Sequence, residues 1–201
     1  MTLKPNTRQK EILAKAARLF RKKGYAATSI RDIADQVGMK SASLYNHINS
    51  KQEILQVLLL PIAKIYVTSI DRVNESPLPA IKKLEQIIRD QIVITIENPD
   101  AVSLVPDQWL FLENNEESKT YAYDDYIRLR NHYEKVFIDI FQRAIEEGDL
   151  KSVHIEIACF SILSTLRRLY SWYARHRTVD KSLLERELVM NLLGGLRTIK
   201  K

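Results

Sequence analysis

Apolar side chains recur at helical spacing along almost the whole chain. The first such positions are Ile12, Ala16, Leu19 and Phe20, followed by Ile30, Ile33, Ala34 and Val37. Positions three or four residues apart share one face of a helix, whereas the alternation typical of half-buried strands is absent. The pattern therefore predicts an all-helical fold.

The same spacing, bounded by glycine and proline, predicts about nine helices. Their expected ranges are 7–24, 29–37, 41–48, 51–74, 80–97, 100–113, 119–147, 151–176 and 180–199. Gly24, Gly38 and Gly148 each follow a helical stretch, where a left-handed residue commonly ends a helix. Pro61 falls inside an otherwise helical stretch and predicts a kink near residues 57–61, because proline removes a backbone hydrogen bond.

The first three predicted helices are separated by the short turns GYAAT and GMKS, which is the layout of a helix-turn-helix. In that motif the second helix of the pair lies in the major groove of DNA. Thr28 or Ser29 can cap the second helix, and Asp32 completes a capping box with Ser29. Ser41 is expected to cap the third helix. The helical period turns Leu44 and Ile48 of that helix inward and leaves five residues outside, namely Ala42, Ser43, Tyr45, Asn46 and His47.

Charge is distributed unevenly along the chain. The net charge is +6, but residues 1–51 hold eleven Lys and Arg against three acids, so the rest of the chain is slightly negative. A local excess of +8 fits a polyanionic partner, since each neutralised phosphate releases condensed counterions. A merely solvated charged face is the alternative.

The segment TSIRDIADQVGMKSASLYNHINSKQEIL resembles the DNA-binding signature of the tetracycline-repressor (TetR) family. The resemblance runs from about Arg8 to Leu55 and includes an amphipathic first helix that ends in FRKKGY. It implies that bases or nearby backbone are faced by Lys40, Ser41, Ala42, Ser43, Asn46 and His47, and that phosphates are held by Thr28, Tyr45 and Lys51. Ser29 is counted with the DNA-binding residues. For Tyr45 the alternative is packing between the third and first helices.

The sequence departs from the family pattern at two places. Asn46 stands where histidine is common, and Ile48-Asn49 stands where phenylalanine and a basic or polar residue are common. These departures affect the expected operator sequence and leave the expected fold unchanged.

The family resemblance implies a DNA-binding domain at residues 1–51 and a ligand-binding and dimerisation domain at residues 52–201. Two apolar stripes near the C-terminus fit a four-helix interface across a two-fold axis. The first stripe is Ile155, Ala158, Cys159, Ile162, Leu163, Leu166, Leu169, Tyr170 and Tyr173, and the second is Leu183, Leu184, Leu188, Leu192, Leu193 and Leu196. An intramolecular core is the competing interpretation.

The segment LRRLYSWYARHR places Arg168 and Trp172 four residues apart, on one helix face. We expect them at the mouth of a ligand cavity, where guanidinium can bind an anion and indole can stack on a ring. The segment resembles a TetR subgroup that responds to acyl-coenzyme A thioesters. A solvated basic cluster beside the dimer surface is the alternative.

Eight aromatic residues in the middle of the chain are expected to lie mostly in the core, with a minority facing a pocket. They are Trp109, Phe111, Tyr121, Tyr123, Tyr126, Tyr133, Phe137 and Phe141. Trp109 is counted with Arg168 and Trp172 as a candidate ligand-binding residue.

Several classes of protein are disfavoured. The polar N-terminus lacks a signal-peptide pattern and the longest apolar run, 57–63, is too short to span a membrane, which predicts a cytoplasmic protein without a membrane partner. The single cysteine, Cys159, is expected to be a small buried hydrophobe. His132, His154 and His176 lack neighbours at metal-ligand spacing, and no cofactor is expected. Catalytic motifs are also missing, so we expect no enzyme.

These observations together predict a transcriptional regulator, expected to be a repressor, that binds a palindromic double-stranded DNA operator as a homodimer. A small-molecule effector, for which an acyl-CoA thioester is one candidate, is expected to release it. Two recognition helices must sit about 34–36 Å apart to enter successive major grooves, so a small pivot of each abolishes joint contact. The rival interpretations are a DNA-binding protein that does not respond to a ligand and an enzyme fused to a DNA anchor.

Overall fold

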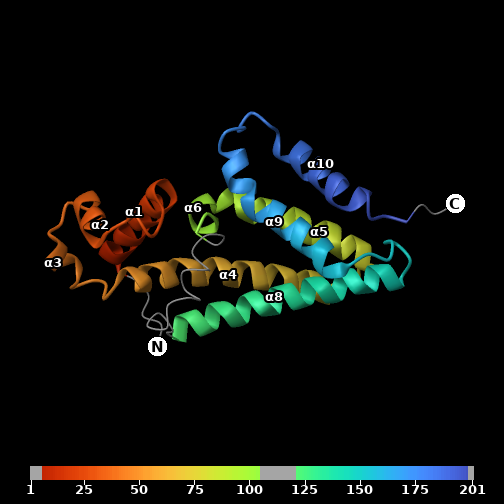
Figure 1. Cartoon of the computed structure of the whole chain (residues 1–201), viewed down its shortest axis with the longest axis horizontal. Coiled ribbons are helices and arrows are strands. Elements are labelled where there is room, and N and C mark those ends of the chain that lie inside the picture. Colours follow the sequence, from red (N-terminus) through yellow and green to blue (C-terminus); the bar gives the residue numbers. More distant parts are fainter. Residues whose placement is uncertain (1–5, 105–120, 199–201) are drawn as a thin grey trace. The chain divides into compact units, whose positions relative to one another are not determined.

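The computed structural model describes residues 6–104 and 121–198, and its regular elements in that part are all helices (Figure 1). They are α1 (Thr7–Lys23), α2 (Ile30–Gln36), α3 (Ser41–Leu44), α4 (Lys51–Glu75), α5 (Ala80–Glu97), α6 (Pro99–Val102), α8 (Tyr121–Glu146), α9 (Ile155–Tyr173) and α10 (Lys181–Gly194). The predicted all-helical fold is therefore confirmed.

Three predicted helices are clearly shorter in the structure. α3 ends at Leu44 and not at residue 48, because residues 45–47 form a turn. α9 and α10 are shorter because the chain makes other backbone hydrogen bonds at their ends. α9 begins at Ile155 rather than at residue 151, since the Lys151 N–H donates to the Leu196 carbonyl at 2.8 Å. α10 ends at Gly194, and the Thr198 N–H donates to the Asp149 carbonyl at 3.0 Å. The backbone groups of the two segments thus form hydrogen bonds with each other instead of extending the two helices. Of the helix expected at 100–113, α6 occupies the start, and residues beyond 104 lie outside the described part.

The chain forms two compact units. The head unit comprises residues 1–62 and 100–126, and the body unit comprises residues 63–99 and 127–201. α4 belongs to both, because the boundary falls between Ile62 and Ala63, one residue beyond Pro61. The helix is continuous through Pro61, and the kink expected near 57–61 stays a prediction. The sequence-based division at residue 51 likewise remains a functional interpretation.

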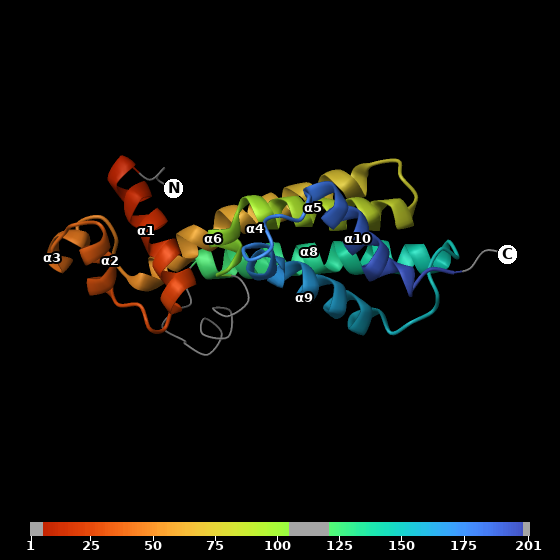
Figure 2. The ribbon, with the colours of Figure 1, turned by 90° about the horizontal axis from the view of Figure 1, so that it is seen from above.

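In the head unit, α1, α2 and α3 pack around a small core (Figure 2). α1 contributes Ile12, Ala16 and Phe20 to it, each at most 2% exposed. The Phe20 ring meets the Tyr25 ring edge-on, with 5.0 Å between centroids. This packing fixes where α2 and α3 stand on α1, and burial raises the pKa of Tyr25 to about 12.

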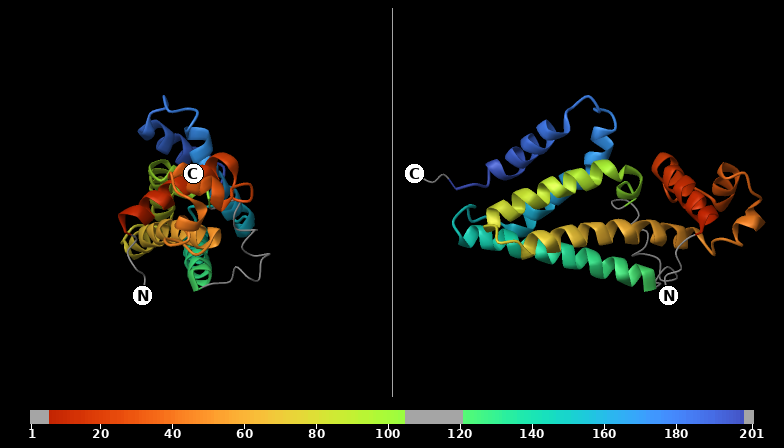
Figure 3. Two further views of the ribbon diagram at one scale, coloured as in Figure 1. Left: turned by 90° about the vertical axis from the view of Figure 1, so that its left-hand side faces the viewer. Right: turned by 180° about the vertical axis from the view of Figure 1, so that it is seen from behind.

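In the body unit, α5 contacts both α9 and α10 (Figure 3). The core includes Leu84 and Ile88 from α5, Phe137 and Phe141 from α8, and Leu166 from α9, all fully buried. The predicted burial of aromatic residues is confirmed for Tyr133, Phe137 and Phe141 in this core and for Tyr126, which belongs to the head unit. Trp109, Phe111 and the side chains of Tyr121 and Tyr123 lie outside the described part.

Most of the first apolar stripe lies in this intramolecular core and does not form an outer surface. Its buried members are Ala158, Cys159, Ile162, Leu163, Leu166 and Leu169. The second stripe is divided, with Leu184 and Leu193 buried and Leu183 41% exposed. The intramolecular interpretation is therefore right for these buried residues. Cys159 is buried as predicted, and burial raises the pKa of its thiol to about 12.

α4 is long and apolar enough to pass a length-and-composition test for a membrane span, with a mean hydropathy of 1.6 over its best 18-residue window. The core helix of a protein outside membranes passes the same test. Ile54, Leu55 and Leu59 are buried in the head unit and Ile70 in the body unit, so α4 supplies core to both units. This double role accounts for its apolar composition.

Candidate nucleic-acid interface

The start of α2 is fixed by the capping box expected from the sequence. The Asp32 N–H donates to Ser29 Oγ at 3.1 Å, and the Ser29 N–H donates to Asp32 Oδ2 at 2.7 Å. Lys23 Nζ donates to Asp32 Oδ1 at 2.9 Å. The hydrogen bonds from Lys23 and Ser29 hold the pKa of Asp32 well below its usual range. Ser29 therefore serves as a cap in this structure, and its DNA contact stays a prediction.

The turn between α2 and α3 depends on a glycine. Gly38 has a φ of +67°, a left-handed conformation that costs other residues free energy, while the space beside its Cα is open. The turn is closed by the Met39 N–H, which donates to the Ala34 carbonyl at 2.9 Å. The predicted helix-stop role of Gly38 is confirmed, and α3 follows within three residues.

α3 buries one side and exposes the other, as predicted. Leu44 is fully buried and Ile48 is 5% exposed. The exposed residues are Ala42, Tyr45 and Asn46, with Ser41, Ser43 and His47 partly exposed and Lys40 exposed at the N-cap. These seven residues are called the recognition flank below. One local expectation is wrong, because Lys40 and not Ser41 occupies the N-cap and no side chain caps α3.

Tyr45 lies on the recognition flank with 53% of its surface exposed. The alternative in which it packs between the third and first helices does not match this exposure. Tyr45 is exposed like its neighbours Ala42 and Asn46, so a phosphate or base edge can approach it.

Lys51 and Thr28 have structural contacts that the sequence did not indicate. Lys51 Nζ donates to the carbonyls of Tyr25 and Thr28, both at 2.9 Å, and lies 4.3 Å from the centre of the Tyr25 ring. Thr28 is 1% exposed, and its hydroxyl donates to the Gly24 carbonyl at 2.7 Å. Burial lowers the pKa of Lys51. Both residues therefore hold the turn between α1 and α2, and a phosphate contact by the Thr28 hydroxyl would require that turn to open.

We expect Lys51→Met to lower the free energy of unfolding of the protein by about 1–2 kcal/mol. This value is at the lower end of the range for hydrogen bonds to charged groups, because the site is partly exposed to solvent. Urea unfolding followed by circular dichroism measures this. Lys51→Arg should not restore it, since a planar fork replaces a compact ammonium between two carbonyls. Lys40→Met, at an exposed position, is the matched control. An unchanged unfolding midpoint for Lys51→Met would rule out the structural role of Lys51 and leave its predicted phosphate contact as the remaining role.

Two further polar residues of α1 anchor the helix-turn-helix. Arg8 Nη2 donates to the Val37 carbonyl at 2.9 Å, and Gln9 Nε2 donates to the His47 carbonyl at 3.0 Å. Val37 ends α2 and His47 follows α3, so α1 is tied to both helices. Sequence reasoning missed both contacts because their partners are 29 and 38 residues away.

Arg168 and Trp172 lie on an exposed face of α9 in the body unit. Trp172 is 39% exposed and stacks on His176, with 4.4 Å between ring centroids and 12° between ring planes. Neither residue lines the body-unit hollow described next. Their ligand contact stays a prediction, and Trp109, the third candidate, is outside the described part.

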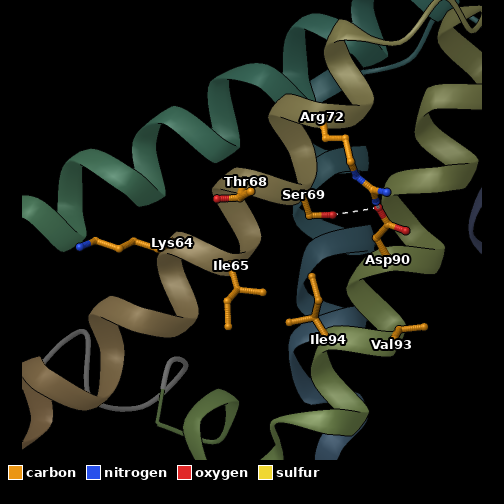
Figure 4. Close-up of a pocket in the computed structure, with 8 residues that line it drawn as sticks. All are labelled: Lys64, Ile65, Thr68, Ser69, Arg72, Asp90, Val93 and Ile94. Carbon is orange, nitrogen blue, oxygen red and sulfur yellow. Dashed lines mark hydrogen bonds and ion pairs between the residues drawn. The ribbon is translucent and has the colours of Figure 1, made fainter. Parts of the chain in front are cut away.

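A hollow of about 510 Å³ lies between α4 and α5 (Figure 4). Its lining residues are Lys64, Ile65, Thr68, Ser69, Arg72, Asp90, Val93 and Ile94. At one end Asp90 accepts hydrogen bonds from Ser69 Oγ at 2.8 Å and Arg72 Nη2 at 2.6 Å. Ile65 and Ile94 line an apolar part (Figure 4). This hollow was not predictable from the sequence, because its two walls are separate helices that meet only in the fold.

α4, α5 and α8 also bring a group of polar side chains together inside the apolar core. Tyr66 Oη and Thr95 Oγ1 are 3.1 Å apart, and Tyr133 Oη donates to Gln91 Oε1 at 2.7 Å. Thr95 and Gln91 are at most 4% exposed, and burial holds the pKa of Tyr133 well above its usual range. Within the described residues no group of three or more His, Cys, Asp or Glu is placed to hold a metal ion.

Comparison with known proteins agrees with this geometry. The family model for bacterial regulatory proteins of the tetR family matches residues 12–58, and the model for the tetracyclin repressor-like C-terminal domain matches residues 77–196. The transcriptional repressor KstR2 of Rhodococcus jostii is 25% identical over 190 residues, which are 94% of this chain and 91% of that protein.

Two solved structures show the same fold. The structure of the ketosteroid transcriptional regulator KstR2 of Mycobacterium tuberculosis matches with a TM-score of 0.85 at 22% identity. The superposition covers 98% of this chain and 98% of that one. AibR, in complex with isovaleryl coenzyme A and operator DNA, has a TM-score of 0.71 at 21% identity over 91% of this chain and 96% of that one. Since the two family models together match most of the sequence, this chain belongs to the TetR family of DNA-binding transcriptional regulators.

Proposed function

We propose that this protein is a cytoplasmic, ligand-responsive transcriptional repressor that binds a palindromic operator as a homodimer and is released by a small-molecule effector. The main evidence for DNA binding is that α3 and the turn after it have one buried side and one exposed side. Leu44 and Ile48 anchor it in the core while the recognition flank stays exposed. The basic excess of residues 1–51 supplies the attraction to the phosphate backbone.

Selection of bound duplexes from a random pool tests this proposal. The recovered sites should contain two inverted half-sites whose centres lie about 34–36 Å apart or a multiple of that. Recovered sites with a single unpaired half-site would contradict the dimeric mode, and failure to enrich any sequence at low ionic strength would contradict specific DNA binding.

The homodimer is supported by apolar side chains that α9 and α10 leave exposed. Ile157 and Phe160 on α9 are 62% and 71% exposed, and Met190 on α10 is 54% exposed. Between the apolar positions of α9, Ser161 Oγ donates to the Ile157 carbonyl at 2.8 Å, so its hydroxyl does not need water. An exposed apolar surface with satisfied polar groups suits burial against a second copy of itself.

We expect Phe160→Asp to convert the dimer into monomers at micromolar concentration, because a charge would be buried without a partner. Sedimentation velocity measures the change, and operator affinity should fall with it. Ile65→Asp, at an exposed isoleucine of α4, is the matched control and should remain dimeric. A Phe160→Asp protein that sediments as a dimer would place the interface elsewhere.

Ligand response is supported by the bonded polar side chains in the body core and by the hollow between α4 and α5. Mutually bonded polar side chains in an apolar core contribute less stability than apolar packing, and they supply the few placed polar groups that a small-molecule site needs. The AibR complex with isovaleryl coenzyme A makes an acyl-CoA thioester the class of effector to test first. Arg168 and Trp172 are the side chains that we propose for the charged and aromatic parts of such a molecule.

We expect Arg168→Ala to raise by about tenfold the concentration of an acyl-CoA needed to release the operator, since one charge-assisted contact to phosphate is lost. Fluorescence anisotropy of labelled operator DNA measures this release. Arg175→Ala removes a neighbouring exposed arginine and should leave the response unchanged. Equal sensitivity of Arg168→Ala and wild type would rule out the role of Arg168, and an operator complex insensitive to every acyl-CoA would favour a different effector.

A further inference from the structure

A second hollow, of about 450 Å³, lies in the head unit beside the last turns of α1. It is lined by Arg18, Arg21, Lys22 and Asp100. Arg18 lies three residues before Arg21 and four before Lys22, so its side chain neighbours both on the surface of α1. Asp100 comes from α6, and its Oδ1 is 2.6 Å from Arg21 Nη1. The hollow therefore has two positive charges more than negative ones.

This basic face is separate from the parts of the head unit already described. The opposite side of α1 carries Ile12, Ala16 and Phe20 into the core, so Arg18, Arg21 and Lys22 are not needed for packing and all three are exposed. Cations in a last helical turn also interact favourably with the helix dipole. That interaction does not account for a carboxylate from a second helix, 79 residues away, at the same place.

We propose that this hollow binds a phosphate-bearing small molecule. The planar guanidinium groups of Arg18 and Arg21 match phosphate oxygens with paired hydrogen bonds, and Lys22 adds a compact positive charge. Like-signed charges around a concave surface concentrate the field on an anion inside it. The volume lies within the range of small-molecule sites. In this structure the Asp100 carboxylate is the anion paired with Arg21.

Occupation of the site has a structural consequence within the head unit. A phosphate that takes Arg21 competes with Asp100, so binding breaks the ion pair between α1 and α6. Phosphate binding is thereby coupled to the ion pair between α1 and α6. Removal of the Asp100 charge should therefore increase the affinity for phosphate.

Isothermal titration of the full chain with inorganic pyrophosphate tests the site. We expect saturable binding of one pyrophosphate per chain, at least tenfold weaker in the Arg18→Gln/Lys22→Gln double variant. Asp100→Asn should bind about threefold tighter or more, whereas Asp35→Asn, an exposed acid on α2, should match wild type. Unfolding midpoints of all variants, measured alongside, establish that each is folded.

A second double variant, Lys10→Gln/Arg31→Gln, removes two exposed head-unit cations outside the hollow. It should keep the wild-type affinity for pyrophosphate. An equal loss in both double variants would show a diffuse field and overturn the site, as would the absence of saturable binding to wild type. Weaker operator binding by Arg18→Gln/Lys22→Gln, without a change in pyrophosphate affinity, would make these cations DNA contacts and also overturn the proposal.

Discussion

Ala42→Glu should weaken operator binding by at least about 100-fold. Ala42 is exposed in the first turn of α3, where a small side chain lets the helix approach base edges. A glutamate there adds bulk and places a negative charge among phosphates. Anisotropy titration with a duplex recovered by selection measures the loss at one fixed salt concentration.

The same substitution on the outer side of α1 is the control for Ala42→Glu. Ala14 is exposed and helical like Ala42, and Ala14→Glu changes the net charge by the same amount. It should weaken binding only slightly, because the charge is remote and screened by salt. Both variants should unfold at the wild-type urea concentration. Comparable losses in the two would mean that α3 is not the element inserted into DNA.

Phe137→Ala should lower the free energy of unfolding of the body unit by about 3–5 kcal/mol. Phe137 of α8 is fully buried in the body core with Leu84, Ile88 and Leu166. Truncation removes its transfer free energy and leaves a cavity that fixed helices can only partly fill. Urea unfolding at one fixed protein concentration measures the change, since a dimer would make stability depend on concentration.

Leu78→Ala is the comparison for Phe137→Ala. Leu78 is a large apolar residue 42% exposed between α4 and α5, and its truncation should change the free energy of unfolding by about 0.5 kcal/mol or less. Amide exchange should show the Phe137→Ala effect chiefly in α5, α8 and α9. A loss below about 1 kcal/mol would mean that the body core rearranges around the missing ring.

Features set by nearby residues were predictable from the sequence. The capping box needs only Ser29 and Asp32, three residues apart, and it is present. The inward direction of Leu44 and Ile48 follows from the helical period, and both are buried. Gly38 was expected to end a helix, and it has the left-handed φ of such an end. In each case the residues that determine the feature lie within one or two helical turns of each other in the sequence.

Features set by distant residues were not predictable in this way. Lys51 carries the charge expected of a phosphate contact, but its carbonyl partners lie 23 and 26 residues earlier in the chain. Periodicity found the apolar face of α9 without showing what covers it. Leu166 is covered by the same chain, whereas Phe160, on the other side of the helix, is exposed. Periodicity already placed Phe160 outside the stripe, but only the packed structure shows that the stripe is covered by the same chain while Phe160 stays exposed.

The contacts of Lys51 also restrict how the DNA-reading element can respond to a signal. Lys51 is the first residue of α4, and its ammonium holds the loop directly before α2. Displacement of the first turn of α4 would pull that loop along with it, and Arg8 and Gln9 would carry α1 in the same direction. We therefore expect α1, α2 and α3 to rotate as one rigid body. The proposed effector would then change the orientation of the DNA-contacting surface and leave its shape unchanged.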